Sequence, residues 1–184
     1  MQGDLMRRKR WFGWSMLLAL SAVALIPVWA WRAESAEKKG DPAVERARQE
    51  VKMLDDLYKT AVVLITENYV QEDSDVPAGT AAKKLFEAMK AKGWHEVRLI
   101  DATGDPIEKE NLPRKGFETR ALEKLNGGAS FFDEVEIMEG KKYLRAATPI
   151  PVVLDKCVMC HDHYKKFKAE GKIIGVLGYT VPIE

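Results

Sequence analysis

The sequence predicts an α+β fold with an antiparallel sheet, and three observations support this. Apolar residues first recur at helical spacing, the pattern then changes to short strand-like runs, and turn signals join the later runs into a meander. Helices followed by hairpin-connected strands are typical of the α+β class. Residues 37–184 are enough for one compact domain with a core, and too few for two.

The start of the chain predicts export. Basic residues at 7–10 precede an uncharged run over 11–31, which is long enough to cross the hydrocarbon core of a bilayer as a helix. The basic flank favours the cytoplasmic side, so the rest of the chain would be exported. A signal peptide cleaved after Ala30 and an uncleaved anchor with tryptophans at both ends both fit this run. We therefore predict a signal peptide or membrane anchor with a linker over 1–36, and a folded domain over 37–184 in the periplasm or on the outer face of the inner membrane.

Two helices are predicted at the start of the folded domain. Pro42 suits the beginning of a long helix of about seven turns, because the apolar residues that follow are three and four positions apart. This stripe comprises Ala47, Val51, Leu54, Tyr58, Ala61, Val62, Ile65 and Tyr69. A second helix is predicted over 81–92, with Thr80 as its N-cap and Gly93 at its end. Its expected inner face comprises Leu85, Phe86 and Met89.

The pattern then changes to that of strands. Residues 96–101 predict a strand and residues 102–105 a turn, and Pro106 lies near the start of a predicted short returning strand. A short helix is expected next, with Gly127 at its end. Its inward side chains are expected to be Phe117, Ala121 and Leu125.

A hairpin is predicted after this short helix. It joins residues 131–138 to residues 143–148 through a turn at 139–140. Pro149 and Pro151 are expected to end the second strand or to place it at an edge, because proline cannot donate to a sheet ladder.

The stretch "KCVMCHDH" follows in a loop or single turn, before a last strand predicted over 173–181. Cys157 and Cys160 are three positions apart, and His161 comes directly after them. This spacing is typical of c-type haem attachment, in which two sulfurs bind the vinyl groups of haem and the imidazole binds the iron. We therefore expect one covalently attached haem c, with His161 as the proximal iron ligand. Covalent attachment also suits an exported protein, which cannot recover a lost cofactor from a cellular pool.

Other uses of these residues have less support. A structural zinc site with Cys157, Cys160 and His163 needs a fourth ligand, and only His95 remains, at a distance in sequence. A thiol–disulfide oxidoreductase usually has its cysteine pair at the start of a helix in a βαβ unit, and no parallel pattern surrounds this motif. A plain disulfide between positions three apart is geometrically poor.

Five stretches of the sequence together are typical of one family: "RLIDATGDPI", "GFETRALEKL", "YLRAATPIPVV", "CVMCH" and "GYTVPI". On these stretches, residues 42–184 resemble the bacterial periplasmic c-type haem proteins with a PAS-like fold, a family long catalogued as a domain of unknown function. The resemblance implies a PAS-like antiparallel sheet with flanking helices and a small cavity between them. It also implies one haem on Cys157, Cys160 and His161.

The sixth iron ligand has several candidates. Some relatives offer the iron a cysteine from elsewhere in the domain, but this chain has only two cysteines, so that ligation is excluded if both thioethers form. Met53, Met138, His95 and water are the candidates, with Met89 as a further methionine. Packing in the core is the alternative role for Met53 and Met89. A methionine ligand would raise the reduction potential relative to a histidine ligand.

Charged residues near the motif offer two further contacts. Arg145 lies on the strand that leads to the motif and could pair with a haem propionate, although a solvated strand arginine is the alternative. Lysines around the motif could form a mildly basic docking surface or an ordinary solvated face. They are Lys156, Lys165, Lys166, Lys168 and Lys172.

Three functions remain open at this point. The first is periplasmic electron transfer or redox response with a periplasmic or membrane redox partner, since the sequence has no kinase, cyclase or chemoreceptor output segment. The second is a haem-based gas or redox sensor that acts through a partner chain. The third, an enzyme such as a peroxidase, needs an acid–base group, and only His95 is available. Nucleic acid is not expected as a partner, because 29 Lys and Arg face 28 Asp and Glu.

Overall fold

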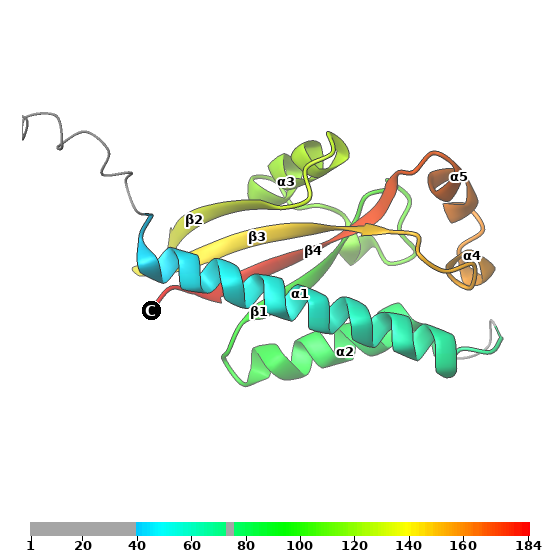
Figure 1. Ribbon diagram of the computed structural model, residues 1–184, viewed down its shortest axis with the longest axis horizontal. Coiled ribbons are helices and arrows are strands. Elements are labelled where there is room, and N and C mark those ends of the chain that lie inside the picture. Colours follow the sequence, from blue (N-terminus) through cyan, green and yellow to red (C-terminus); the bar gives the residue numbers. More distant parts are fainter. Residues whose placement is uncertain (1–39, 73–75) are drawn as a thin grey trace, which may run out of the picture. The chain divides into compact units, whose positions relative to one another are not determined.

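The described part of the chain forms a four-stranded antiparallel sheet with helices on both faces (Figure 1). This computed structural model describes residues 40–72 and 76–184, which belong to one compact unit. The helices are α1 (Pro42–Asn68), α2 (Ala78–Ala91), α3 (Phe117–Asn126), α4 (Cys157–Cys160) and α5 (Tyr164–Ala169), with a 3₁₀ turn η2 (Lys109–Asn111). The strands are β1 (Glu96–Asp101), β2 (Phe132–Met138), β3 (Lys141–Pro151) and β4 (Ile173–Pro182). Their order is β1-β4-β3-β2, so the predicted α+β class with an antiparallel sheet is confirmed.

The predicted membrane segment lies outside the described residues. Residues 11–31 precede Gly40, where the described part of the chain begins. Within 40–72 and 76–184, every helix is too short or too polar to cross a bilayer.

The long helix predicted from Pro42 is confirmed as α1. Asp41 caps it, because its carboxylate accepts a hydrogen bond of 3.0 Å from the backbone N–H of Ala43. Pro42 then occupies the first helical position, where an N–H group would have no helical partner. The buried face of α1 comprises Val44, Ala47, Val51, Leu54, Tyr58 and Thr66.

The second helix begins earlier than predicted. α2 starts at Ala78 with Pro77 at the N-cap, so Thr80 lies inside the helix and the prediction that it caps the helix is wrong. The carbonyl of Pro77 already accepts the N–H of Thr80 at 2.9 Å and that of Ala81 at 3.1 Å, which brings Thr80 into the first turn. Of the three side chains predicted to face inward, one is buried, one half-buried and one exposed: Phe86, Met89 and Leu85, respectively.

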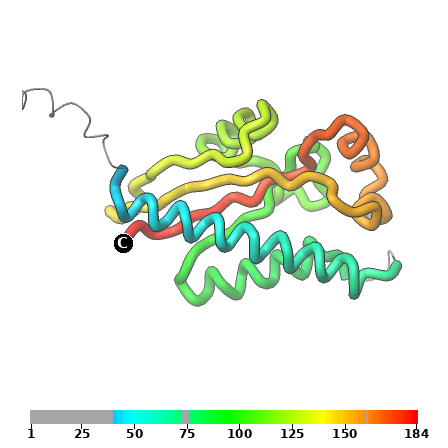
Figure 2. Tube along the Cα trace, in the orientation of Figure 1, coloured from blue at the N-terminus to red at the C-terminus, as the bar shows by residue number. Residues whose placement is uncertain are grey.

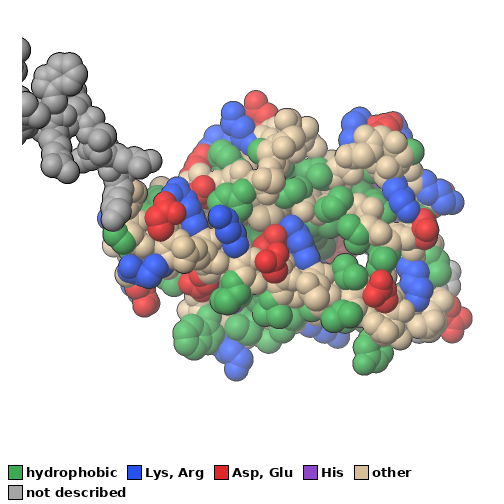
Figure 3. Space-filling view, in the orientation of Figure 1, with side chains coloured by type: hydrophobic (Ala, Val, Ile, Leu, Met, Phe, Trp, Pro, Cys, Tyr) green, Lys and Arg blue, Asp and Glu red, His purple; other side chains and the backbone are tan. Residues whose placement is uncertain are grey.

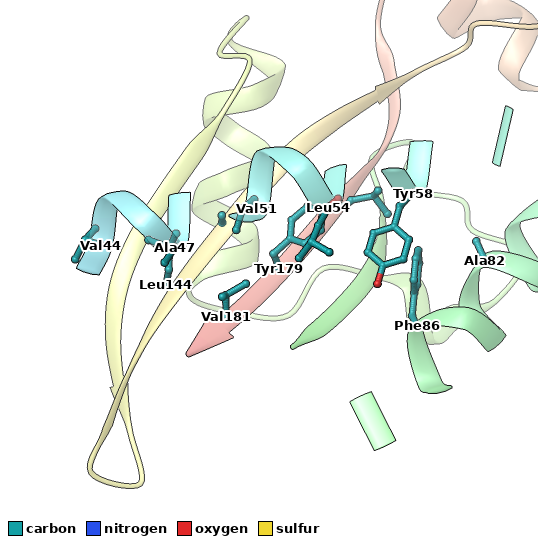
Figure 4. Close-up of a cluster of buried hydrophobic side chains, with 12 residues drawn as sticks. Val44, Ala47, Val51, Leu54, Tyr58, Ala82, Phe86, Leu144, Tyr179 and Val181 are labelled. Carbon is teal, nitrogen blue, oxygen red and sulfur yellow. The ribbon is translucent and has the colours of Figure 1, made fainter. Parts of the chain in front are cut away.

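The larger core lies between α1, α2 and one face of the sheet. Figure 4 shows its side chains gathered between α1 and the strands, with Tyr58 and Phe86 at the side of α2. The ring of Tyr58 meets that of Phe86 edge-on, at 5.0 Å between centroids and 84°. The strand residues in this core are Leu144, Ala146, Leu177, Tyr179 and Val181, which alternate along β3 and β4 as one face of a pleated sheet requires.

The opposite face of the sheet is covered by α3 (Figure 2). The three side chains predicted to face inward are buried there: Phe117, Ala121 and Leu125. They pack against strand residues of the other parity: Ile100, Ala147 and Val176. Gly178 lies in β4 between these layers, where a Cβ atom would come within 2.8 Å of the Cδ1 atom of Ile100. A glycine at this position therefore lets Ile100 lie across the strand.

The prediction of a short returning strand after β1 is wrong. Asp101 ends β1 and accepts a hydrogen bond of 2.6 Å from the N–H of Gly104, which turns the chain. Arg98 of β1 then donates to the carbonyl of Leu112 at 2.8 Å. The segment around Pro106 is thus held by side-chain hydrogen bonds and by the 3₁₀ turn η2 instead of a ladder with β1.

The predicted hairpin and final strand are confirmed as β2, β3 and β4. Glu139 and Gly140 form the turn between β2 and β3 with φ angles of 51° and 77°, as a tight two-residue hairpin turn requires. β3 does not end before Pro149 but continues to Pro151. Its pairing with β2 stops at Ala147, so both prolines lie where β4 is the neighbouring strand. An inner strand accommodates them because this part of β3 is locally an edge.

Candidate functional site

The cysteine motif lies in the connection between β3 and β4. Residues 152–172 form this connection and contain α4 and α5, which lie at the opposite end of the sheet from the C-terminus (Figure 1). The predicted loop or single turn is confirmed, because α4 is one turn long and spans Cys157–Cys160. His161 follows at the C-cap, with φ of −127° and ψ of 72°.

Short-range hydrogen bonds build this turn. The N–H of Cys157 donates to the carbonyl of Leu154 at 3.2 Å, and that of Val158 to Asp155 at 3.1 Å. Bonds between residues three apart tighten the chain into a turn that places positions three apart on one side. The thiol of Cys157 is free and half-buried, whereas the side chain of Cys160 lies outside what the structure describes.

His161 is half-buried, and its imidazole is favoured in the neutral form. Burial lowers the pKa of His161, and the charge of His163 lowers it further. The Nδ1 atom of His161 is buried and has no hydrogen-bond partner among the described residues. A neutral imidazole is the form that binds metals, since the protonated ring has no free lone pair.

An aromatic contact supports the His161 ring. Tyr164, the first residue of α5, stacks on it at 4.4 Å between centroids and 10° between planes. The ring of His163 meets that of Tyr164 edge-on, at 4.6 Å and 71°. Burial, followed by the charges of Asp101 and Cys157, raises the pKa of Tyr164 to about 12. Tyr164 therefore lies close to both the end of β1 and the motif, and it stays neutral at physiological pH.

Side-chain contacts tie the motif to α1 and α5. Lys156 donates to the carbonyl of Val70 at 2.9 Å and to that of Glu67 at 3.0 Å, at the C-terminal end of α1. Asp155 forms an ion pair of 2.6 Å with Lys168 of α5. The first contact thus ties the connection to the end of α1, and the second joins two parts of the connection itself, although this ion pair is exposed and weak by itself.

Apolar side chains are exposed around the motif. Val153 and Met159 belong to the connection and are 58% and 42% exposed. Tyr69 is 77% exposed and stands beside Val70, to which Lys156 binds. Exposed apolar side chains grouped at one place often mark a binding surface.

These features are compatible with the predicted attachment of haem. A free and reachable thiol, a neutral imidazole with an unpartnered buried nitrogen, and apolar surroundings match what thioether formation and iron ligation need. Attachment at Cys157, Cys160 and His161 stays a prediction. Within the described residues, no group of three or more His, Cys, Asp and Glu side chains is arranged to hold a metal ion.

Arg145 makes its described contacts away from the motif. Its Nη1 atom lies 3.2 Å from a carboxylate oxygen of Glu136, and its guanidinium lies 4.7 Å from the ring centroid of Phe117. Phe117 belongs to α3, and Glu136 has the same parity in β2 as Phe132, which packs against the α3 core. The Nε atom of Arg145 is buried without a hydrogen-bond partner in the described structure. The structure therefore does not bring Arg145 and the motif together.

The methionine candidates for the sixth ligand also lie apart from the motif. Met138 ends β2 beside the hairpin, and the motif follows the other end of β3, roughly 30 Å away at the usual rise per residue. Met53 is 64% exposed on α1, about 20 Å along the helix from Glu67. Met89 is half-buried in α2.

His95 is buried in the core of the domain. It is 5% exposed, and its Nε2 atom lies 2.7 Å from the hydroxyl of Tyr58 under α1. Burial lowers its pKa. His95 stands just before β1, whereas Asp101 near Tyr164 ends that strand, about 20 Å further along. The tertiary structure thus gives His95 a partner in the core.

A cavity of about 210 Å³ lies between α2, β1 and η2, away from the motif. Its lining includes Phe86, Leu99, Arg98, Lys83 and Arg114. Lys83 and Arg98 already form ion pairs with Glu108, Glu110 and Glu118. Neither the motif nor any predicted ligand lines this cavity.

The lysines around the motif are largely paired. Three of them form ion pairs with neighbouring acids: Lys165 with Asp162, Lys168 with Asp155, and Lys172 with Glu170. Acidic and basic side chains are also interspersed across the face that Figure 3 shows. The described contacts therefore favour an ordinary solvated face over a strongly basic docking surface.

Two contributors to the site, Tyr164 and Asp101, were missed at the sequence level, and so was the contact of Lys156 with the end of α1. The position of Tyr164, three residues after His161, was a usable signal, because side chains at this spacing meet when the chain turns. No sequence signal linked Lys156 to the end of α1.

Comparison with known proteins gives the family of the chain. The family model described as Tll0287-like, Tll0287, matches residues 37–182. No curated protein matches the sequence. Because the match covers the folded domain almost completely, the chain belongs to the Tll0287-like family.

Proposed function

We propose that this chain is an exported single-haem protein of c type that acts in periplasmic electron transfer or redox response. Cys157 and Cys160 would hold the haem through thioether bonds, and His161 would bind its iron. The observation that carries the proposal is the one-turn helix α4, directly followed by a half-buried imidazole that is favoured in its neutral form. Haem bound there would supply reversible one-electron chemistry.

The chain's own residues suit this role. The thiol of Cys157 is free and half-buried, which leaves it within reach of a cofactor. Val153, Met159 and Tyr69 expose apolar surface beside it, as a large apolar group requires for burial. The connection between β3 and β4 lies at one end of the domain, where a redox partner can approach.

We also propose that residues 37–184 are a PAS-like domain in the periplasm or on the outer face of the inner membrane. The order of long helix, second helix, strand, short helix, hairpin and final strand supports the PAS-like assignment. The basic flank and apolar run over 11–31 support export, either as a cleaved signal or as an anchor.

One observation favours a second role, a haem-based gas or redox sensor that acts through a partner chain. Lys156, next to Cys157, binds the carbonyl of Glu67 in the last turn of α1 and that of Val70 just after the helix. α1 also exposes a row of apolar side chains to solvent: Met53, Leu57 and Leu64. A change at the motif could therefore reach a helix that has apolar surface for a partner.

Haem attachment can be tested on the full chain, produced with and without cytochrome c maturation machinery. We expect covalently bound haem, resistant to acid-acetone extraction, only in the first case. Cys157→Ser and Cys160→Ser should each leave a haemochrome spectrum of a single thioether, and the double variant should lose covalent haem. Colourless protein after full maturation would contradict the proposal.

Carbon monoxide added to the reduced protein then separates the roles, because a spectral change favours a gas sensor.

A further inference from the structure

Tyr164 makes two contacts with His161. Its ring lies nearly parallel to the imidazole, 4.4 Å between centroids and 10° between planes, and its backbone N–H donates to the carbonyl of His161 at 2.9 Å. His163 packs edge-on against the same tyrosine ring. The hydrogen bond fixes the backbone turn after the motif, and the stacked ring fixes what can lie against one face of the imidazole.

The usual restraint on such a histidine is missing here. When a histidine binds a metal through one ring nitrogen, the other nitrogen normally donates to a carboxylate or carbonyl, which sets the ring plane. The buried Nδ1 atom of His161 has no hydrogen-bond partner among the described residues. The ring contacts that remain are the parallel stack on Tyr164 and an edge-on contact with His163, at 5.9 Å between centroids and 81° between planes. The stack is the closer of the two, and it is the contact that lies parallel to the imidazole.

We propose that Tyr164 is a positioning residue, whose aromatic ring sets the plane of the His161 imidazole before and after haem attachment. The proposal rests on the function proposed above. It assigns the effect to the ring of Tyr164 and not to its hydroxyl, because the stacked geometry involves only the rings. The ring is itself held in place, since α5 packs against β4.

The proposal can be tested first on the full chain without haem. NMR spectra of the imidazole C–H groups should show His161 ring signals moved upfield by the ring current of Tyr164. Tyr164→Phe should keep this shift, whereas Tyr164→Leu and Tyr164→Met should lose it. Met offers a flexible apolar replacement of similar length if Leu prevents folding.

The haem-loaded full chain gives the second measurement. Electron paramagnetic resonance of the ferric protein reports the plane of an axial imidazole, and the reduction potential reports its bonding to iron. Tyr164→Leu and Tyr164→Met should retain covalent haem, but they should show several or broadened sets of g values in place of one set, and their reduction potentials should shift. Tyr164→Phe should match the unaltered chain in both measurements.

Each result has a defined reading. Unchanged NMR shifts, or an unchanged resonance and potential in folded Leu and Met variants, would overturn the assignment to Tyr164. If the Leu and Met variants lose the NMR shift without haem but keep the resonance and the potential with haem, the assignment is overturned for the haem-loaded protein. If the unaltered chain acquires no haem after maturation, the proposed function fails, while the NMR comparison still decides whether the ring of Tyr164 stacks on that of His161.

Discussion

Lys156 hydrogen-bonds to Val70, and this single side chain joins the cysteine turn to the end of the long helix. Its ammonium group donates to the carbonyl of Val70 at 2.9 Å and to that of Glu67 at 3.0 Å. Carbonyls at a helix C-terminus have no partner within the helix, and the helix dipole favours a positive charge there. The two segments are 86 residues or more apart in the sequence, so only the folded chain brings them together.

Lys156→Met should weaken this junction. Removing a partly exposed charged donor from two carbonyls is expected to lower the free energy of unfolding by about 1 kcal/mol. Urea unfolding followed by circular dichroism would measure the change. Lys166→Met is the matched control, because the side chain of Lys166 makes no hydrogen bond or ion pair with the described residues. Equal losses in the two variants would contradict a specific role for Lys156.

Asp55→Ala should destabilise the domain more strongly. The carboxylate of Asp55 on α1 accepts hydrogen bonds from the hydroxyls of Thr148 at 2.5 Å and Tyr179 at 2.9 Å, and it pairs with Lys59 at 2.9 Å. Alanine would leave the hydroxyl of the fully buried Tyr179 without this acceptor, at a cost of about 2–4 kcal/mol. Thermal and urea unfolding would measure this loss.

Exposed Asp56 offers the control for that network. Asp56→Ala should change the free energy of unfolding by less than about 0.5 kcal/mol, as substitutions at the surface usually do. Asp55→Asn, which keeps one acceptor oxygen, should fall between the two alanine variants. A loss in Asp55→Ala no larger than in Asp56→Ala would show that the network does not stabilise the fold.

His95 should make stability depend on pH. Burial lowers its folded pKa below the ordinary value of 6.5, so the unfolded chain takes up the proton first as the pH falls. The free energy of unfolding should therefore decrease as the pH drops below about 6.5 towards the folded pKa, and stay level above this window. Protonation would also remove the Nε2 lone pair of His95, which can accept a hydrogen bond from the hydroxyl of Tyr58.

The measurement compares urea unfolding of the unaltered chain and His95→Gln between pH 5 and pH 8. The substitution should reduce the slope below pH 6.5, and Tyr58→Phe, which keeps the imidazole, should retain it. His161 adds its own slope to the chain without haem, because its pKa is also lowered. The difference in slope between the unaltered chain and His95→Gln isolates the contribution of His95. Identical slopes in these two chains would rule this effect out.

Arg145→Met should act on stability and not on haem. The guanidinium lies beside Glu136 and over the ring of Phe117, and loss of both contacts is expected to lower the free energy of unfolding by about 1 kcal/mol. We expect the reduction potential of the haem-loaded chain to stay unchanged. A clear shift in the potential would instead support the predicted pairing of Arg145 with a propionate.

Substitution of the methionine candidates should leave the haem spectrum unchanged. Met53 is exposed on α1, and Met138 ends β2, beside the end of β3 that lies far from the motif. Met53→Leu and Met138→Leu should therefore give the optical spectra of the unaltered chain in both oxidation states. Loss of a methionine-to-iron absorption band in either variant would identify that residue as the sixth ligand.

Much of the fold follows from local rules that the sequence displays. The apolar spacing from Pro42, the Glu139-Gly140 turn and the three inward residues of α3 each depend on neighbours a few positions away. Such features are determined by helix and strand geometry and by turn conformations. The failed predictions, Thr80 as a cap and a strand at Pro106, concern the ends of elements, where side-chain hydrogen bonds compete with regular structure.

The sequence by itself determined the order of elements and the five-residue motif, because both depend on spacing along the chain. Only the tertiary structure decided that His95 is buried beside Tyr58, that Tyr164 stacks on His161, and that Lys156 reaches the end of α1. The contacts of His95 and Lys156 depend on strand register and helix packing over long sequence separations, and the stack of Tyr164 on His161 depends on how the chain turns after the motif. A local pattern shows which residues can take part in a site, whereas the packing of the whole domain fixes which of them meet.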